Sequence, residues 1–171
     1  TEVYAAVLEG AARALAGLPD GVLGVAPHSL RAVGRDTLGR VAGMTQGPIH
    51  IHIAEQVAEV AEVQAAWGAR PVDWALANLP VDPRWCMIHA TQMTMEETAA
   101  LARTGAVAGL CPITEANLGD GIFDAPRWLA AGGAFGVGTD SNVRISLAEE
   151  LRLLEYSQRL GLKARAVMAD S

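Results

Sequence analysis

The segment PIHIHIAE, residues 48–55, decides the fold class of this 171-residue chain. It begins with a short apolar run of strand length and ends in the polar residues His52 and Glu55. Residues 56–67, which follow directly, carry apolar side chains at three- and four-residue spacing, as amphipathic helices do. The segment therefore predicts a βα unit whose buried strand carries polar side chains at its carboxyl end.

The same unit recurs along the chain. Strand-length apolar runs occupy residues 22–26, 49–54, 85–89, 106–111 and 134–138. Helical patterns occupy residues 3–18, 36–42, 56–67, 72–77, 94–103, 125–131 and 147–160. Thr94 with Glu97, and Ser146 with Glu149, have the spacing of a capping box at the start of two helices. This alternation indicates right-handed βαβ units in a parallel sheet, with strands buried on both faces.

Two α/β architectures fit this alternation: an open, doubly wound sheet and a (β/α)8 barrel. No GxGxxG or GxxxxGK[ST] motif follows a strand, which excludes the commonest nucleotide-binding form of the open sheet. Five βα units cannot close a barrel of eight strands. Either the sheet is open, or this chain, a single domain over residues 1–171, is only part of a barrel, and the residues at the strand ends favour the second. The family resemblance described below implies that this part is the C-terminal one, without the N-terminal strands.

Composition narrows the partners and the compartment. A net charge of −6 argues against nucleic acid as a partner. No apolar run is long enough to cross a membrane and no signal-peptide pattern is present, so we expect a cytoplasmic protein without a membrane partner. Cys86 and Cys111 are isolated in apolar runs, which favours two buried thiols over a disulfide.

Polar residues collect where the predicted strands end, which is where barrel enzymes keep their active sites. His28 follows the first run, His52 and Glu55 end the second, His89 ends the third, and Asp140 follows the fifth. A hydrolytic metal site needs imidazole and carboxylate ligands, and separate groups that move protons. The set predicts such a site, with His52 and Asp140 as candidate ligands, although any one residue alone fits a structural role.

Three other features leave alternatives open. His50 lies one pleat below His52, so it fits a lower barrel layer better than a chelating pair. Arg31, three residues after His28, fits a carboxylate-binding corner as well as it fits a plain surface position. The polar loop of residues 115–121 either lines the site or is a simple turn.

The motifs resemble those of the formimidoylglutamate deiminase family of the amidohydrolase superfamily, from about residue 21 to residue 166. The resemblance rests on residues 26–33, 50–56, 85–91, 109–123 and 138–142. The HxxE and TDS elements are shared by many amidohydrolase deaminases. The segments PHSLRAV (residues 27–33) and TEANLGDGIF (residues 114–123) are specific to a much smaller group of proteins.

The resemblance implies a zinc site. The family's metal is held by an HxH pair on strand 1, a His on strand 5 and an Asp on strand 8. The positions that match here are His52 and Asp140. The HxH pair has no counterpart in this chain, so the five runs become strands 4 to 8 and two further ligands are expected from the missing strand 1.

The resemblance also implies the reaction. Glu55 matches the family's proton shuttle, and His89 and Asp140 match the groups beside the hydrolytic water. His28 and Arg31 match positions that hold the carboxylate end of the substrate. Water would attack the formimidoyl carbon of N-formimidoyl-L-glutamate, giving N-formyl-L-glutamate and ammonia in histidine breakdown.

Gln92 and Asn142 depart from the family pattern, where many members have His. They leave open another amidohydrolase deaminase, acting on guanine or another nucleobase. A second alternative is a metal-free fragment that only binds a ligand or a partner subunit. The expected partners are therefore a small-molecule substrate with carboxylates and the missing N-terminal barrel half. The family resemblance also implies a second copy of the chain, in a homodimer.

Overall fold

The computed structural model describes residues 2–169 and has a parallel four-stranded sheet. The strands are β1 (Ile49–Ile53), β2 (Trp85–His89), β3 (Val107–Leu110) and β4 (Ala134–Val137). They lie side by side in chain order, and every neighbouring pair is parallel. A doubly wound sheet reverses its order at a switch point, whereas consecutive barrel strands do not. The order therefore confirms an α/β fold of the partial-barrel type.

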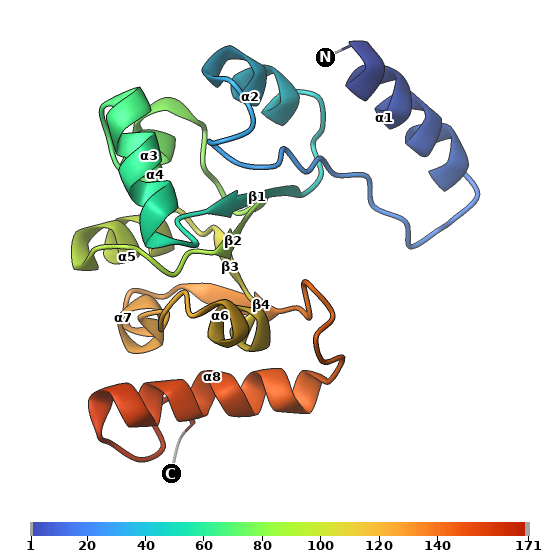
Figure 1. Ribbon diagram of the computed structural model, residues 1–171. Coiled ribbons are helices and arrows are strands. Elements are labelled where there is room, and N and C mark those ends of the chain that lie inside the picture. Colours follow the sequence, from blue (N-terminus) through green and yellow to red (C-terminus); the bar gives the residue numbers. More distant parts are fainter. Residues whose placement is uncertain (1, 170–171) are drawn as a thin grey trace.

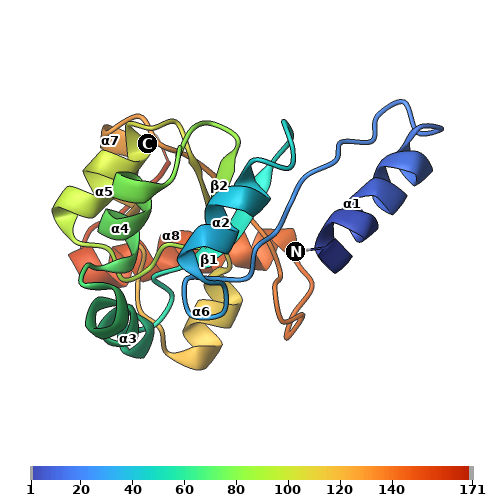
Figure 2. The same cartoon turned by 90° about the horizontal axis from the view of Figure 1, so that it is seen from above.

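Helices connect the strands (Figure 1). They are α1 (Glu2–Leu15), α2 (Arg35–Ala42), α3 (Val57–Trp67), α4 (Pro71–Asn78), α5 (Met95–Ala102), α6 (Pro112–Leu118), α7 (Ala125–Ala130) and α8 (Leu147–Leu162). Helix α1 lies at the edge of the fold in both views and buries none of its residues (Figure 2). Tyr4 and Leu8 pack against the core, and the Tyr4 hydroxyl accepts from the backbone N–H of Ala26. Among the described residues, no helix is both long enough and apolar enough to span a bilayer.

The predicted capping box at Thr94 is confirmed. The Thr94 hydroxyl accepts from the backbone of Glu97, and the Glu97 carboxylate accepts from the backbone of Thr94. The second predicted box is only half formed, because the Ser146 hydroxyl accepts from Glu149 while the Glu149 carboxylate binds Arg144 instead. Helix α6 was not predicted, since seven residues are too few to show a helical period.

The first predicted strand, residues 22–26, is wrong as a regular strand. The chain from residue 22 to residue 29 runs parallel to β1 but meets it only in two isolated bridges, Val25 with Ile49 and Ser29 with His52. Pro27 lies between the two bridges, and proline has no N–H to continue the ladder. The segment still brings His28 to the carboxyl end of β1, because the His28 carbonyl accepts from the backbone of His52.

The sequence predicts strands that are buried on both faces, and for β1 this prediction is wrong. Ile49, Ile51 and Ile53 are buried in the core, whereas His50 is exposed and His52 is half-buried on the opposite face. Side chains alternate across a strand, so one face packs against helices and the other presents both histidines. The isoleucine face anchors the strand, and the histidine face is the one available for chemistry.

Close backbone contact fixes the segment beside β1, and it can be tested at Gly47. A Cβ at Gly47 would collide with the backbone carbonyl of Leu23, whereas a Cβ at the exposed helical Gly39 meets nothing within 4 Å. We expect Gly47→Ala to lower the free energy of unfolding by about 1–3 kcal/mol. Gly39→Ala should raise it by about 0.5–1 kcal/mol. Urea unfolding of both variants measures this, and shifts of the same sign would contradict the assignment.

Candidate active site

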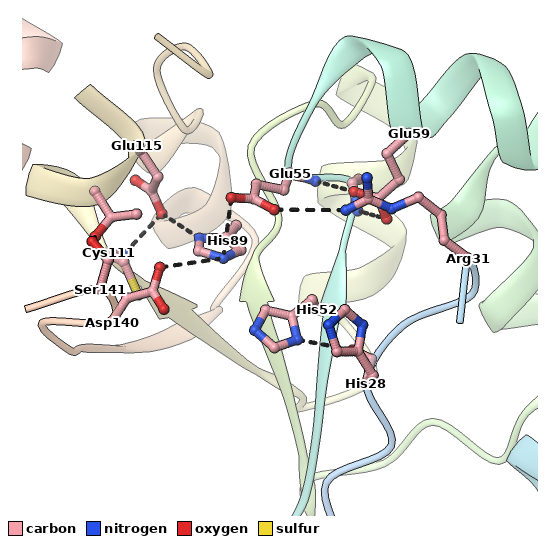
Figure 3. A network of polar contacts seen from close by, with 12 residues as sticks. His28, Arg31, His52, Glu55, Glu59, His89, Cys111, Glu115, Asp140 and Ser141 are labelled. Carbon is pink, nitrogen blue, oxygen red and sulfur yellow. Dashed lines mark hydrogen bonds and ion pairs between the residues drawn. The ribbon is translucent and has the colours of Figure 1, made fainter. Parts of the chain in front are cut away.

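Four of the residues predicted from the sequence meet at the carboxyl ends of the strands (Figure 3). His89 Nε2 lies 3.6 Å from Glu55 Oε1 and 3.9 Å from Asp140 Oδ2. The rings of His52 and His89 stack with their centroids 5.6 Å apart. Glu55 follows β1 and Asp140 follows β4, so the outer strands of the sheet contribute to one cluster around His89.

His52 is oriented by a backbone carbonyl. The His28 carbonyl oxygen accepts from the His52 backbone N–H at 3.0 Å and lies 2.8 Å from His52 Nδ1. A carbonyl oxygen only accepts hydrogen bonds, so Nδ1 must carry the ring proton. The lone pair of the neutral ring is then on Nε2, and a metal-binding histidine is held in the same way.

His89 is oriented by Glu115, whose part in the site the sequence left open. His89 Nδ1 lies 3.3 Å from Glu115 Oε1, which also accepts from the backbone N–H of Cys111 at 2.8 Å. His89 and Glu115 are both buried. The position of Glu115, just after a strand, was the only sequence signal for this contact.

The cluster shifts the proton affinities of its members. Burial lowers the pKa of His89, but the hydrogen bond that it donates to Glu115 and the charges of Glu55, Glu115 and Asp140 outweigh it, so the pKa lies above its ordinary value. Burial also raises the pKa of Glu55 above its ordinary value, although His89 opposes the shift. A carboxyl group with a raised pKa suits a residue that both gives and takes protons near neutral pH.

Glu55 is held in place by Glu59, a buried residue in the first turn of α3. The Glu59 carboxylate accepts from the backbone N–H of Ala54 at 3.0 Å and of Glu55 at 2.8 Å. Ala54 has a left-handed backbone with a φ of 51°, which a residue with a Cβ rarely adopts. The two hydrogen bonds stabilise this bend, which directs the chain from β1 into the site.

The turns after β2 and β4 are strained in the same way. His89 (φ 69°), Ala90 (φ 49°), Asp140 (φ 41°) and Asn142 (φ 56°) all have positive φ. Such conformations persist only where surrounding structure fixes them, and they concentrate at functional sites. Asn142 helps to fix the second turn, because its side-chain oxygen accepts from the Thr139 hydroxyl at 2.8 Å.

His28 and Arg31 lie at the same end of the sheet. The His28 ring is 5.0 Å from the His52 ring, centroid to centroid, and Arg31 reaches to 3.9 Å from Glu55 Oε2. Both residues are exposed, so both remain accessible to a ligand. His50, by contrast, lines a hollow with Pro48 and Cys86 near the amino ends of the strands.

Two sets of side chains have metal-binding chemistry. His89, Cys111 and Glu115 bring potential ligand atoms within 4.8 Å of one another. Burial, followed by the charges of nearby carboxylates, raises the pKa of the Cys111 thiol to about 12, so that thiol is protonated when no metal is bound. The second set is His52, whose Nδ1 faces the His28 carbonyl, and the partly exposed carboxylate of Asp140; imidazole and carboxylate are both ligands of zinc.

A parallel βα sheet with histidines and carboxylates at its carboxyl ends is typical of barrel hydrolases, many of which use a metal ion. The chain belongs to the amidohydrolase family, which matches residues 1–170. It is 56% identical over 140 residues to formimidoylglutamate deiminase of Pseudomonas aeruginosa, covering 81% of this chain and 31% of that protein. The resemblance drawn from the motifs is thereby confirmed.

Other relatives agree with this family. A 5-methylthioadenosine/S-adenosylhomocysteine deaminase of Nitratidesulfovibrio vulgaris is 33% identical over 133 residues, which cover 74% of this chain and 30% of that protein. The crystal structure of an amidohydrolase from Brucella melitensis is 55% identical, with a TM-score of 0.96, and the match covers 99% of this chain and 38% of that one. The chain therefore spans about a third of the length of these relatives.

A more distant structure supports the fold alone. The crystal structure of an adenosine deaminase from Xanthomonas campestris with bound zinc has a TM-score of 0.89 at 24% identity, covering 96% of this chain and 39% of that one. A structure with this fold is thus known with zinc bound.

The contact between Glu59 and the backbone predicts a loss of stability on Glu59→Gln. The amide keeps one acceptor oxygen and turns an NH2 group toward the second N–H, which should lower the free energy of unfolding by about 1–3 kcal/mol. Glu62→Gln is the matched control, because Glu62 is exposed on the same helix and should shift stability by less than about 0.5 kcal/mol. Equal unfolding midpoints for the two variants would refute this positioning role.

Proposed function

We propose that this chain is part of a zinc-dependent hydrolase that converts N-formimidoyl-L-glutamate and water to N-formyl-L-glutamate and ammonia, in histidine breakdown. The observation that carries the proposal is the position of Glu55 between Arg31 and His89, at 3.9 and 3.6 Å. This places a proton-carrying carboxyl between a cation suited to the substrate's carboxylate and a buried imidazole. The identity of 56% with a formimidoylglutamate deiminase supports the same choice of substrate.

In this proposal His52, through Nε2, and Asp140 hold the zinc ion. When bound, zinc supplies Lewis acidity that lowers the pKa of a water molecule. Two further ligands would come from a strand-1 HxH pair in the N-terminal half of the barrel. The relatives are long enough to contain such a half, because this chain matches only about a third of their length. A homodimer and a cytoplasmic location belong to the same proposal.

His89 and Asp140 then accept and hold the proton of the attacking water. The water oxygen forms a bond with the formimidoyl carbon, and Glu55 protonates the imine nitrogen. The proton held by His89 and Asp140 then passes to Glu55, which donates it to the same nitrogen. The bond between that carbon and nitrogen breaks and ammonia leaves, while the added hydroxyl becomes the formyl oxygen and returns its proton to Glu55. The hydrogen bond between His89 and Glu115 keeps the imidazole directed at this centre throughout.

The proposal predicts zinc-dependent release of ammonia by the complete protein encoded by the gene. We expect N-formimidoyl-L-glutamate to yield one ammonia per turnover. Chelation should abolish the reaction, added zinc should restore it, and Asp140→Asn should lower the zinc content. Ammonia assays and elemental analysis measure these effects, and full activity of the metal-free protein would contradict them.

Residues 1–171 alone, measured in parallel, test whether this polypeptide is only a metal-free binding module. Tightly bound stoichiometric zinc in the isolated chain would refute that alternative. Without zinc in the isolated chain, activity should appear only when the rest of a barrel is supplied. A chimera with the N-terminal part of the Pseudomonas deiminase can provide it.

Arg31 separates this substrate from a nucleobase or nucleoside, which the 33% identity with a 5-methylthioadenosine deaminase keeps as a second candidate. Arg31→Met should lower kcat/KM for N-formimidoyl-L-glutamate by about ten- to hundredfold, because a charge-assisted hydrogen bond to a carboxylate is lost. Arg40→Met is the control, since Arg40 is exposed on α2 and away from the strand ends. Unchanged kinetics for Arg31→Met would favour the ring substrate.

A further inference from the structure

A cavity of about 260 Å³ lies beside the candidate site, between α6, α8 and the loop that joins α6 to α7. Figure 1 shows α8 running beneath α6 and α7 in the lower half of the molecule. Most of the cavity wall is apolar, with Pro112 from α6, Ile122 and Phe123 from the loop, and Leu153 and Leu154 from α8. Pockets for drug-sized ligands measure roughly 300–1,000 Å³, so this cavity fits a smaller molecule with an apolar body.

Glu115 lines this cavity and also holds His89, so one side chain joins the cavity to the candidate site. The candidate site uses only the oxygen Oε1, which lies 3.3 Å from His89 Nδ1 and accepts from the backbone N–H of Cys111. The second oxygen, Oε2, points away from His89 (Figure 3) and has no hydrogen-bond partner among the described residues. It is not one of the unpartnered oxygens that are sealed from solvent, and the side chain keeps 5% of its surface exposed. Oε2 is therefore an acceptor that a ligand in the cavity can reach.

The polar groups of the cavity wall are acceptors. The other polar side chain there is Ser157, whose hydroxyl donates to the Leu154 carbonyl at 2.8 Å, so its oxygen is left to accept. None of the described residues that line the cavity is basic. A second buried carboxyl, Glu150, lies nearby, since burial raises its pKa and the charge of Glu115 raises it further. A carboxylate oxygen that has lost most of its water needs a donor or a cation in exchange.

We propose that this cavity binds a small primary ammonium ion with an apolar body, whose N–H groups donate to Glu115 Oε2 and to the Ser157 hydroxyl. Hydrogen bonds between ionised groups are about twice as strong as neutral ones, and the apolar body covers the walls of the cavity. The inference goes beyond the proposed function, because this ligand is not the substrate and lies on the far side of Glu115 from His89.

A ligand in this cavity also acts on the candidate site, because the same carboxylate orients His89. The contact between Glu115 Oε1 and His89 Nδ1 is 3.3 Å long, which is beyond the usual range of about 2.7–3.2 Å for an N–H···O bond. Donors at Oε2 draw the carboxylate toward the cavity and weaken this contact further. The ammonium ion is therefore an inhibitor that lowers kcat without competing with the substrate.

Calorimetric titration of the complete protein with 2-phenylethylammonium and with 2-phenylethanol tests the site. The two probes share an apolar body, and only the first is charged. We expect the ammonium ion to bind about tenfold more tightly or better, because only it forms a charge-assisted contact with Glu115. Ala116→Phe, at an exposed position that lines the cavity, fills it and should weaken binding about tenfold or more. Asn117→Phe is the matched control, because Asn117 is exposed on the same helix but does not line the cavity.

Equal binding of the two probes, undiminished binding to Ala116→Phe or equal losses in both Phe variants would refute the site. If Ala116→Phe does not fold, Ser157→Leu fills the cavity from α8 and must abolish the preference for the cation. In ammonia assays with N-formimidoyl-L-glutamate, the ammonium ion should lower kcat and leave KM unchanged. Competition with the substrate would place the ion in the active site instead, and binding without any change in kcat would refute the link to His89. Inactivity of the unmodified protein would refute the proposed function, whereas the titration needs no substrate and still decides whether the cavity binds the cation.

Discussion

Buried glutamates that accept backbone N–H groups are the interaction on which the strand ends of this protein depend. Glu59, Glu97 and Glu115 each lie in the helix that follows a strand, and each accepts from a backbone N–H just before that helix. Glu150 on α8 does the same for Ile113 in α6. All four are buried, and these hydrogen bonds replace part of the water that the carboxylates lose. One oxygen of Glu97 and one of Glu150 have no partner among the described residues.

This device sets both the geometry and the charge of the candidate site. Glu59 bends the chain that leads to Glu55, and Glu115 orients His89, so the proposed proton carriers are positioned before any ligand arrives. The hydrogen bond from His89 to Glu115 and the charges of Glu55, Glu115 and Asp140 raise the pKa of His89 even though burial lowers it.

The sequence was sufficient for the strands β1 to β4, because each is an apolar run bounded by polar residues or glycine. It also predicted that His52, Glu55, His89 and Asp140 would converge, since parallel strands share one carboxyl edge. The first predicted strand is not regular because Pro27 interrupts its pairing with β1, and α6 was not predicted because it is too short to show a helical period. The parts of Glu59 and Glu115 could not be predicted, because their partners are backbone groups that only the folded turn brings within reach.

The described residues supply more of the proposed proton-transfer groups of the candidate site than of its proposed metal ligands. The groups proposed to move protons, Glu55 and His89, lie on neighbouring strands with their positioning glutamates in the same chain. The proposed metal ligands His52 and Asp140 are instead two of the four or so that a zinc ion needs. His50 is exposed on the histidine face of β1, where further barrel strands would cover it. In the proposed function, the groups that transfer protons are therefore positioned by this chain alone, whereas metal binding depends on closing the barrel.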